Sequence, residues 1–261
     1  MRKRNSSSAA GAPPAAEDEA AFLAAYDVTA FERPSLAVDV VVLTVEARAL
    51  RVLLLRRAAH PHRGAYALPG GFVGMTESID GAATRVLRDK AGLDGVFVEQ
   101  LYTFGAPGRD PRTRVVSVAH YALVDARLLA RPPEEEPDPD RVVADVVVPW
   151  AGETGGPVEV AAQSGARLAL AFDHADVIGA AVKRLRGKLD YTPVGFQLLP
   201  RSFTLRDLQD VHEVVRGEEL NKDSFRRRML AGGLLEATGE REQATTHRPA
   251  ELYRFVRRSA V

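Results

Sequence analysis

The sequence predicts an α+β protein in which a sheet-containing module precedes a winged helix-turn-helix domain. β-branched runs in the first half of the chain, beginning with Leu36–Leu43, are typical of buried strands. A glycine-rich loop leads into a helix within Gly70–Leu93. Towards the C-terminus, two short amphipathic helices separated by Gly217 precede two strand-like segments. This order of elements predicts two modules of different architecture.

Length and composition favour an intracellular two-domain protein. The 261 residues suit two domains of roughly 100 to 200 residues each. We expect a disordered tail over residues 1–30, which are rich in Ala, Ser, Pro and Glu, then domains over 31–190 and 191–261. The absence of cysteine excludes disulfides, thiolate metal sites and cysteine nucleophiles. No apolar run approaches the ~18 residues of a membrane span, so we expect a cytoplasmic protein without a membrane partner.

The net charge is zero, but it is unevenly distributed along the chain. Residues 181–261 hold 16 Lys and Arg against 11 Asp and Glu, a net of +5, whereas residues 1–180 hold 19 against 24, a net of −5. A basic C-terminal part indicates that nucleic acid is its partner.

The first domain alternates strand and helix patterns. We expect strands over Leu36–Leu43, Arg51–Leu55, Val96–Phe104, Val115–Val124 and Val142–Trp150, and helices over Ser78–Ala91 and Leu168–Leu189. A hairpin through Glu46–Ala49 would join the first two strands. The polar Gly/Pro-rich loop 105–113 either contacts a ligand or is a plain turn. His174 is expected to cap or pack, with a ligand role as the alternative.

The second domain has the pattern of a winged helix. Thr204 stands at an N-cap position, Gly217 ends the helix that follows, and Asn221 caps a second, basic helix over Lys222–Leu230. Two strand-like ends, Leu234–Ala237 and Leu252–Val256, would form the wing. In a helix-turn-helix the second helix enters the major groove of DNA. The alternative is a solvated basic helix beside a structural hairpin.

The segment Gly70–Leu93 resembles a Nudix box, the signature of hydrolases that act on nucleoside diphosphates linked to another group. That signature reads G-x5-E-x7-R-E-U-x-E-E-x-G-U, where U is aliphatic, and the chain matches it at Gly71, Glu77, Arg85, Leu87, Gly92 and Leu93. The resemblance implies a Nudix fold, in which a mixed sheet lies between helices. Glu77 and Arg85 are expected to be a structural pair that holds the loop against the helix.

Three carboxylate positions of the box are substituted. Val86, Asp89 and Lys90 stand where the metal-binding glutamates belong, and their i, i+3, i+4 spacing would place them on one helical face. Mg²⁺ requires oxygen ligands, which Val86 lacks, and Lys90 places an ammonium in the position of the metal. We therefore expect no metal site, no catalytic residues and no efficient hydrolysis.

Both modules, in this order, resemble the Nudix-related transcriptional regulators of NAD metabolism, the NrtR type. The likeness covers roughly residues 31–258 and includes Arg109–Arg112, Ala171–His174, Lys188–Pro193 and Phe225–Arg227. It implies a homodimeric repressor that binds an operator in double-stranded DNA and is controlled by ADP-ribose or a related nucleotide, without a cofactor. The alternative is an active hydrolase of ADP-ribose or another nucleoside diphosphate derivative, with the C-terminal module used for dimerisation.

For the effector, we expect Lys90 to act as a counterion to the diphosphate, helped by Arg109 or Arg112 and by Phe72 of the box loop. The alternative for Lys90 is a solvent-exposed position at a helix end, where a cation also suits the helix dipole.

For DNA, we expect Arg226 and Arg227 of the second helix to supply most of the affinity. Further candidates for DNA contact are Thr204, Lys222, Ser224 and the wing residue Arg248.

Overall fold

The computed structural model describes residues 19–130, 138–189, 191–243 and 249–256. The chain separates into two compact units, residues 1–33 and 34–261. In the first unit, α1 (Glu19–Ala25) is a helix without a buried residue. This helix lies within the tail expected over residues 1–30, and the first 18 residues of that tail lie outside the described ones. No helix in the described ranges is long and apolar enough to cross a membrane.

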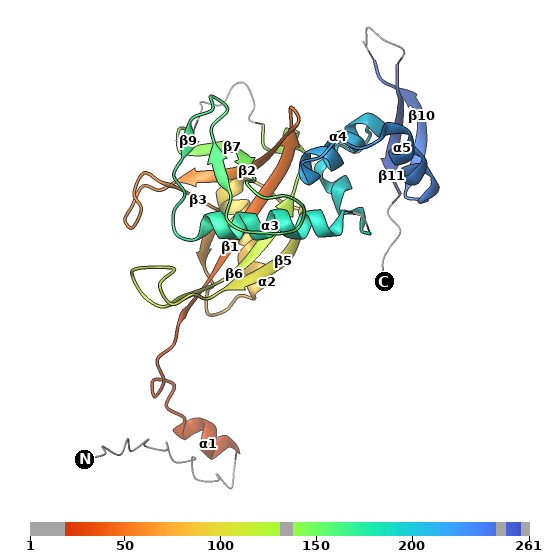
Figure 1. Cartoon of the computed structure of the whole chain (residues 1–261). Coiled ribbons are helices and arrows are strands. Elements are labelled where there is room, and N and C mark those ends of the chain that lie inside the picture. The colour runs from red at the N-terminus through yellow and green to blue at the C-terminus, as the bar shows by residue number, and fades with distance from the viewer. Residues whose placement is uncertain (1–18, 131–137, 190, 244–248, 257–261) are drawn as a thin grey trace, which may run out of the picture. The chain divides into compact units, whose positions relative to one another are not determined.

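The second unit contains a nine-stranded mixed sheet (Figure 1). Its strands are β1 (Ser35–Glu46), β2 (Ala49–Arg56), β3 (Tyr66–Ala67), β4 (Gly70–Phe72), β5 (Phe97–Phe104), β6 (Val115–Leu123), β7 (Arg141–Val147), β8 (Glu159–Ala161) and β9 (Arg167–Leu168). The order is β5-β6-β1-β2-β7-β8-β9, with β3 paired to β2 and β4 to β1. Strands β1 and β6 are parallel, and the remaining pairs are antiparallel. The predicted mixed sheet is thus confirmed.

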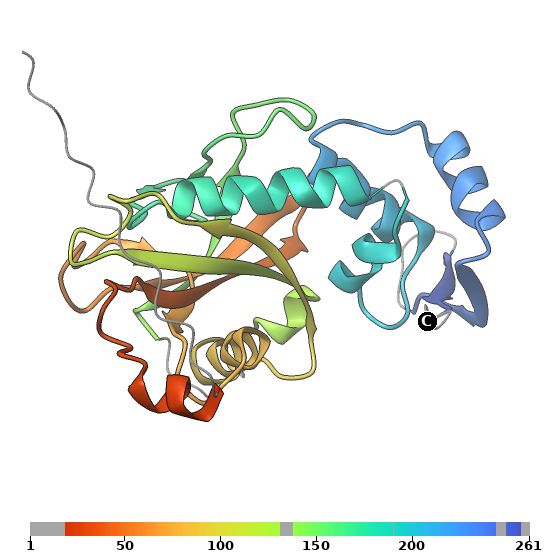
Figure 2. The ribbon, with the colours of Figure 1, turned by 90° about the horizontal axis from the view of Figure 1, so that it is seen from below.

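Helices cover both faces of the sheet (Figure 2). On one face lies α2 (Ile79–Val86), which continues as a π-helical turn over Leu87–Ala91, and on the other lies α3 (His174–Lys188). Strand β1 explains this arrangement, because its side chains alternate between the faces. Val40 packs in the core beneath α2, and Val41 packs in the core beneath α3. A 3₁₀ turn, η2 (Ala126–Leu128), follows β6.

The helix predicted over Leu168–Leu189 begins later than expected. Leu168 ends β9, Leu170 forms an isolated bridge with Tyr66, and Phe172 has a left-handed backbone with φ 53°. Apolar residues in this short stretch fit a strand as well as a helix, and pairing with β8 and with Tyr66 decides between them. The helix therefore starts at His174.

The β1–β2 hairpin turns within Glu46–Ala49, as predicted, and Glu46 pairs with Ala49. Ala47 and Arg48 form a two-residue turn with φ of 48° and 59°, a conformation that usually selects glycine or asparagine. Arg48 projects from this turn to form ion pairs with Asp210 and, at 2.9 Å, with Glu213 of a helix that follows the sheet.

The remaining elements form the predicted winged helix. They are η3 (Pro193–Leu198), α4 (Leu205–Arg216), α5 (Lys222–Ala231) and the hairpin of β10 (Leu235–Arg241) with β11 (Glu251–Phe255). Thr204 and Asp207 form a capping box at the start of α4, which ends at Gly217 with φ 72°. The side chain of Asn221 caps α5. These local signals explain why the helix boundaries agree with the prediction.

Helix α4 belongs to two hydrophobic cores. Val211 and Val215 pack in the core that lies between the sheet and α3. Leu205 and Leu208 pack in a separate core with Phe225 of α5 and residues of the wing. Helix α4 of the winged helix therefore shares a hydrophobic core with the sheet module.

Candidate functional site

A cavity of about 580 Å³ opens beside the box loop. Its wall includes the carboxyl end of β2, strand β4, the loop after β5 and the start of α3. The cationic residues lining it are Arg56, Arg57, Lys90, Arg109 and Arg112; the acidic ones are Asp39, Asp110, Asp138 and Asp140; the aromatic ones are Phe72 and Phe172. The sequence-predicted effector residues Lys90, Arg109, Arg112 and Phe72 thus lie around one cavity.

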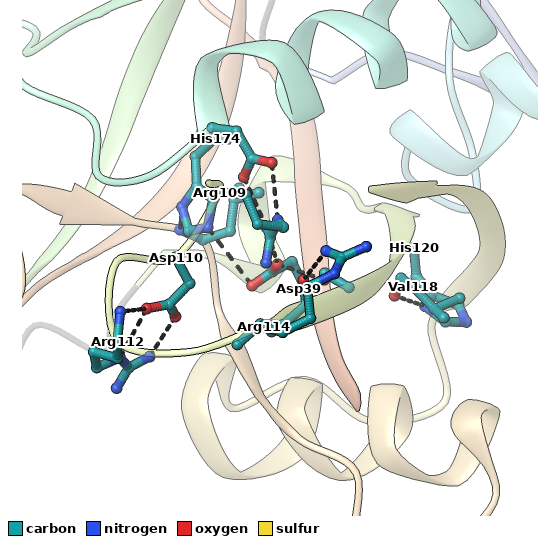
Figure 3. A network of polar contacts seen from close by, with 12 residues as sticks. Asp39, Arg109, Asp110, Arg112, Arg114, Val118, His120 and His174 are labelled. Atoms are coloured by element: carbon teal, nitrogen blue, oxygen red, sulfur yellow. Dashed lines mark hydrogen bonds and ion pairs between the residues drawn. The ribbon is translucent and has the colours of Figure 1, made fainter. Parts of the chain in front are cut away.

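The floor of the cavity is a buried polar network (Figure 3). Asp39 of β1 accepts a hydrogen bond from Ser117 at 2.6 Å and one from Arg109 at 3.2 Å. Arg109 also donates two hydrogen bonds, of 2.9 and 2.7 Å, to Asp173. His174 Nδ1 accepts from the Leu68 amide at 3.0 Å, and burial lowers the pKa of His174 below its ordinary 6.5. The first turn of α3 is therefore tied directly to the cavity floor.

Arg109 is a poor partner for a ligand phosphate, contrary to the sequence-based expectation. Its side chain is 5% exposed, and two carboxylates already neutralise it. A buried ion pair with complete hydrogen bonding is costly to open. This pairing is not predictable from the sequence, because Asp39 and Asp173 are 70 and 64 residues away along the chain. We assign Arg109 to the support of the cavity.

Lys90 is exposed at the cavity wall, and its ammonium group donates a hydrogen bond of 2.5 Å to the carbonyl of Gly70. Lys90 therefore lies beside the box loop, whereas the alternative placed its side chain in contact with solvent alone. Val86 and Asp89 do not accompany it: Val86 is fully buried in the core, and Asp89 pairs with Arg88 at 3.0 Å. Of the three substituted positions, only Lys90 lines the cavity in the described part of the chain.

Arg112 and the aromatic rings form the rim of the cavity. Arg112 pairs with Asp110 at 2.7 Å, and its guanidinium lies 6.0 Å from the ring centroids of both Phe72 and Phe172. Phe72 is 51% exposed. A planar cation beside one exposed and one half-buried ring marks a place where a flat ring can also bind.

Two residues of the wall were missed by the sequence analysis. Arg57 follows β2, donates to the carbonyl of Pro61 at 2.8 Å, and lies 4.7 Å from the centroid of Phe172. Within the described ranges, neither Arg57 nor Lys90 forms an ion pair with a carboxylate. Phe172 has a left-handed backbone, which is strained for a residue with a side chain. Only the tertiary fold brings these segments together.

Glu77 and Arg85 form the predicted structural pair. Arg85 donates hydrogen bonds of 2.9 and 2.6 Å to Glu77 and another of 3.0 Å to the carbonyl of Phe72. Arg85, together with the amide of Gly74, lowers the pKa of Glu77 to about 2. The pair therefore connects the box loop to α2.

The described residues contain no group of three or more His, Asp or Glu placed to hold a metal ion. At the box itself, Asp89 is the single carboxylate among the three substituted positions. The charge that faces the cavity from this turn is the cation of Lys90.

A second candidate site is the outer surface of α5. Lys222, Ser224, Arg226 and Arg227 are exposed there, while Phe225 is buried against α4. An exposed basic helix that follows a capped helix and a tight turn has the geometry of a DNA-reading helix.

Thr204 does not belong to this exposed surface, so its assignment to DNA contact is corrected. It is 3% exposed, its hydroxyl donates to Asp207 at 2.9 Å, and it accepts from the Asp207 amide at 3.1 Å. Its role is to cap α4. Arg248 lies outside the described residues.

Comparison with known families gives two matches in the order of the two modules. Residues 33–151 match the NUDIX domain, and residues 195–255 match the NrtR DNA-binding winged helix domain. The chain is 34% identical over 240 residues to a protein of Acinetobacter baylyi described as "ADPR responsive transcriptional repressor NtrR". That match covers 91% of this chain and 88% of the relative.

Solved structures show the same arrangement. The crystal structure of Shewanella oneidensis NrtR is 34% identical, with a TM-score of 0.68, over 85% of this chain and 94% of that one. The same protein complexed with a 27mer DNA is 33% identical, with a TM-score of 0.67, over 85% and 93% of the two chains. The chain therefore belongs to the NrtR family of Nudix-related transcriptional regulators with a C-terminal winged helix.

Proposed function

We propose that this protein is a transcriptional repressor whose binding to DNA is controlled by ADP-ribose or a closely related nucleotide. The observation that carries the proposal is the joint presence, in one compact unit, of a cavity lined by cations and an exposed basic helix. The relative from Acinetobacter baylyi, which responds to ADP-ribose by its description, supports the choice of effector. By analogy with the family, the regulated genes are those of NAD synthesis or salvage.

The cavity suits a nucleoside diphosphate. A diphosphate carries about two negative charges at neutral pH, and Lys90 and Arg57 offer charges that no carboxylate of the described chain neutralises. Charge-assisted hydrogen bonds to phosphate are the stronger class of hydrogen bond. Phe72 and Phe172 offer faces on which the base of the nucleotide can stack. Arg112 lies between these features and can contact either part.

The DNA interface is assigned to α5 and the wing. Arg226 and Arg227 are the principal contacts, with Lys222 and Ser224 beside them, and Arg248 is retained as a backbone contact of the wing. A homodimer is included in the proposal, because helix-turn-helix proteins commonly bind two half-sites through two-fold symmetry.

The proposal includes no hydrolytic activity. Hydrolases of the Nudix type position divalent cations with the carboxylates that Val86 and Lys90 replace. A cation at Lys90 instead neutralises the phosphates without activating water, so the ligand is bound and released intact.

The test is a titration of ADP-ribose into a complex of the full-length protein with labelled DNA from upstream of its own gene. Fluorescence anisotropy reports DNA binding, and chromatography of the same samples reports AMP and ribose 5-phosphate. We expect ADP-ribose to release the DNA without being cleaved, whereas AMP at equal concentration has a much smaller effect.

Two results would contradict the proposal. One is equal affinity for the upstream DNA and for a scrambled duplex at physiological salt. The other is hydrolysis of ADP-ribose with no effect on DNA binding, which would favour the hydrolase alternative.

A further inference from the structure

Helix α3 connects the cavity to the winged helix. Its 15 residues, His174–Lys188, span about 20 Å at 1.5 Å per residue. Its first residue, His174, and the preceding Asp173 belong to the polar network of the cavity floor. Its last turn contains Arg186, which contacts α4. One rigid element therefore touches both candidate sites.

At the cavity end, the sensitive residue is Phe172. Its ring lines the cavity beneath the guanidinium of Arg57, and its backbone is in the left-handed region at φ 53°. Such a conformation persists only where the surroundings hold it. A ligand that contacts the ring acts on a residue that is two positions before His174. A shift of Phe172 is thus transmitted to the first turn of α3 through the chain itself.

At the other end, Arg186 holds the C-terminus of α4. It is buried, and its Nε donates a hydrogen bond of 2.7 Å to the carbonyl of Val215. Its Nη1 donates to the carbonyls of Trp150 at 3.2 Å and Gly152 at 2.8 Å, and the guanidinium lies 4.8 Å from the Trp150 ring. The last carbonyls of a helix lack intrahelical donors and carry the negative end of its dipole. A cation at this position fixes α4 relative to α3.

Another contact joins the two modules, but its supporting element is less free to move. Arg48 at the β1–β2 turn pairs with Asp210 and Glu213 of α4. Strand β2, which follows this turn, is hydrogen-bonded to β1 on one side and to β7 on the other. Sliding it would break both ladders. Helix α3 packs on the sheet through side chains, and packed helices shift by small sliding movements.

We propose that α3 transmits effector binding from the cavity to the DNA-binding helices, and that Arg186 is the positioning residue that passes this movement to α4. This inference rests on the proposed function and adds the structural route by which the effector site influences the DNA-binding site. Because α4 packs on α5 through Leu208 and Phe225, a shift at the C-terminus of α4 alters the presentation of the basic helix. Coupling between two binding sites is reciprocal, so each ligand must weaken the other by the same factor.

The experiment compares Arg186→Lys with Arg184→Lys. The first change retains the charge but removes the planar fork that reaches three carbonyls. The second makes the same change on the same helix at Arg184, whose polar contacts in the described structure are with the Leu101 carbonyl at 2.9 Å and Glu99 at 3.4 Å, not with α4. For each protein, DNA affinity is measured with and without saturating ADP-ribose, and ADP-ribose affinity with and without DNA.

For the parent and for Arg184→Lys we expect ADP-ribose to weaken DNA binding by roughly 5- to 150-fold, the usual range of allosteric coupling. For Arg186→Lys we expect this ratio to fall below about 2-fold, while the affinity of DNA-free protein for ADP-ribose stays within about 3-fold of the parent. A residue that only stabilised the fold would change both affinities and leave their coupling intact.

The inference is overturned if Arg186→Lys retains the parental ratio, or if Arg184→Lys lowers it equally. In both cases the proposed function stands. If the parent shows no coupling, the proposed function fails as well. Should Arg186→Lys not fold, amide hydrogen exchange of the parent decides: ADP-ribose should change exchange in residues 185–189 and 213–217, and changes confined to the cavity overturn the inference.

Discussion

The ammonium group of Lys90 lies 2.5 Å from the carbonyl oxygen of Gly70, at the wall of the cavity and on the turn that follows the buried Val86. This contact holds a cation beside the box loop without the help of a carboxylate. A ligand phosphate that enters the cavity can replace the carbonyl as the acceptor of this hydrogen bond. We propose that Lys90 supplies the charge that a hydrolase obtains from bound metal ions.

The first prediction is that Lys90→Ala weakens ADP-ribose binding. A charge-assisted hydrogen bond contributes about 1.5 to 3 kcal/mol, so we expect a loss of roughly 10- to 150-fold in affinity, nearer the lower value because Lys90 is exposed. Isothermal titration calorimetry measures the change, and EDTA should leave the parental affinity unaltered. The matched control is Arg88→Ala, since Arg88 is exposed on the same turn but pairs with Asp89. Loss of parental binding in EDTA, or equal affinities of Lys90→Ala and parent, would show that the counterion assignment is wrong.

The second prediction is that the protein does not turn over ADP-ribose in Mg²⁺ or Mn²⁺. Val86 is fully buried among apolar side chains and Lys90 repels divalent cations, so the turn cannot assemble a set of oxygen ligands. The measurement is product formation over hours by chromatography. A turnover number on the order of 1 s⁻¹, which is ordinary for an enzyme, would refute it.

The parts of the fold with strong local signals were predictable. Thr204 with Asp207, Gly217 and Asn221 fix the ends of the helical pair, because each satisfies backbone groups within a few residues of itself. The box loop was equally clear, since Glu77 and Arg85 pair across eight residues. Such signals need no knowledge of distant segments.

The cavity was less predictable, because its contacts join distant parts of the chain. Arg109 has a positive charge that would suit a ligand phosphate, yet its guanidinium is paired with Asp39 and Asp173. The sheet and the start of α3 bring these two carboxylates to Arg109. Arg57 and Phe172 were missed for the same reason. Val86 was expected beside Lys90, yet its apolar side chain packs in the core and does not line the cavity.

The third prediction concerns DNA affinity. Arg226→Ala and Arg227→Ala should each weaken operator binding, by about 1 to 3 kcal/mol if the guanidinium reads a guanine. If it contacts phosphate, the slope of log K against log salt becomes shallower by about 0.9. Anisotropy titrations at several salt concentrations distinguish the two. Arg167→Ala on β9 makes the same change in charge outside the winged helix and should bind like the parent, whereas parental binding by both α5 variants would assign DNA reading to another surface.

The last prediction is that stability falls with pH below 6.5 because of His174. This imidazole is buried and neutral, with Nδ1 accepting from the Leu68 amide, and burial lowers its pKa. Asp39, 3.7 Å from Nε2, and Asp173 oppose that shift, while Arg109 and Arg57 reinforce it. In the unfolded chain, His174 therefore binds a proton at a higher pH than in the folded protein.

The contribution of the neutral His174 to the free energy of unfolding is complete above pH 6.5. It is lost as the pH falls below 6.5, by up to about 1.4 kcal/mol per pH unit. Urea denaturation at pH 5 to 8 should show this slope in the parent and in His60→Gln, which removes a solvent-exposed imidazole. It should be reduced in His174→Gln, whose amide oxygen can still accept from Leu68. An unchanged slope in His174→Gln would assign the acid sensitivity to another group.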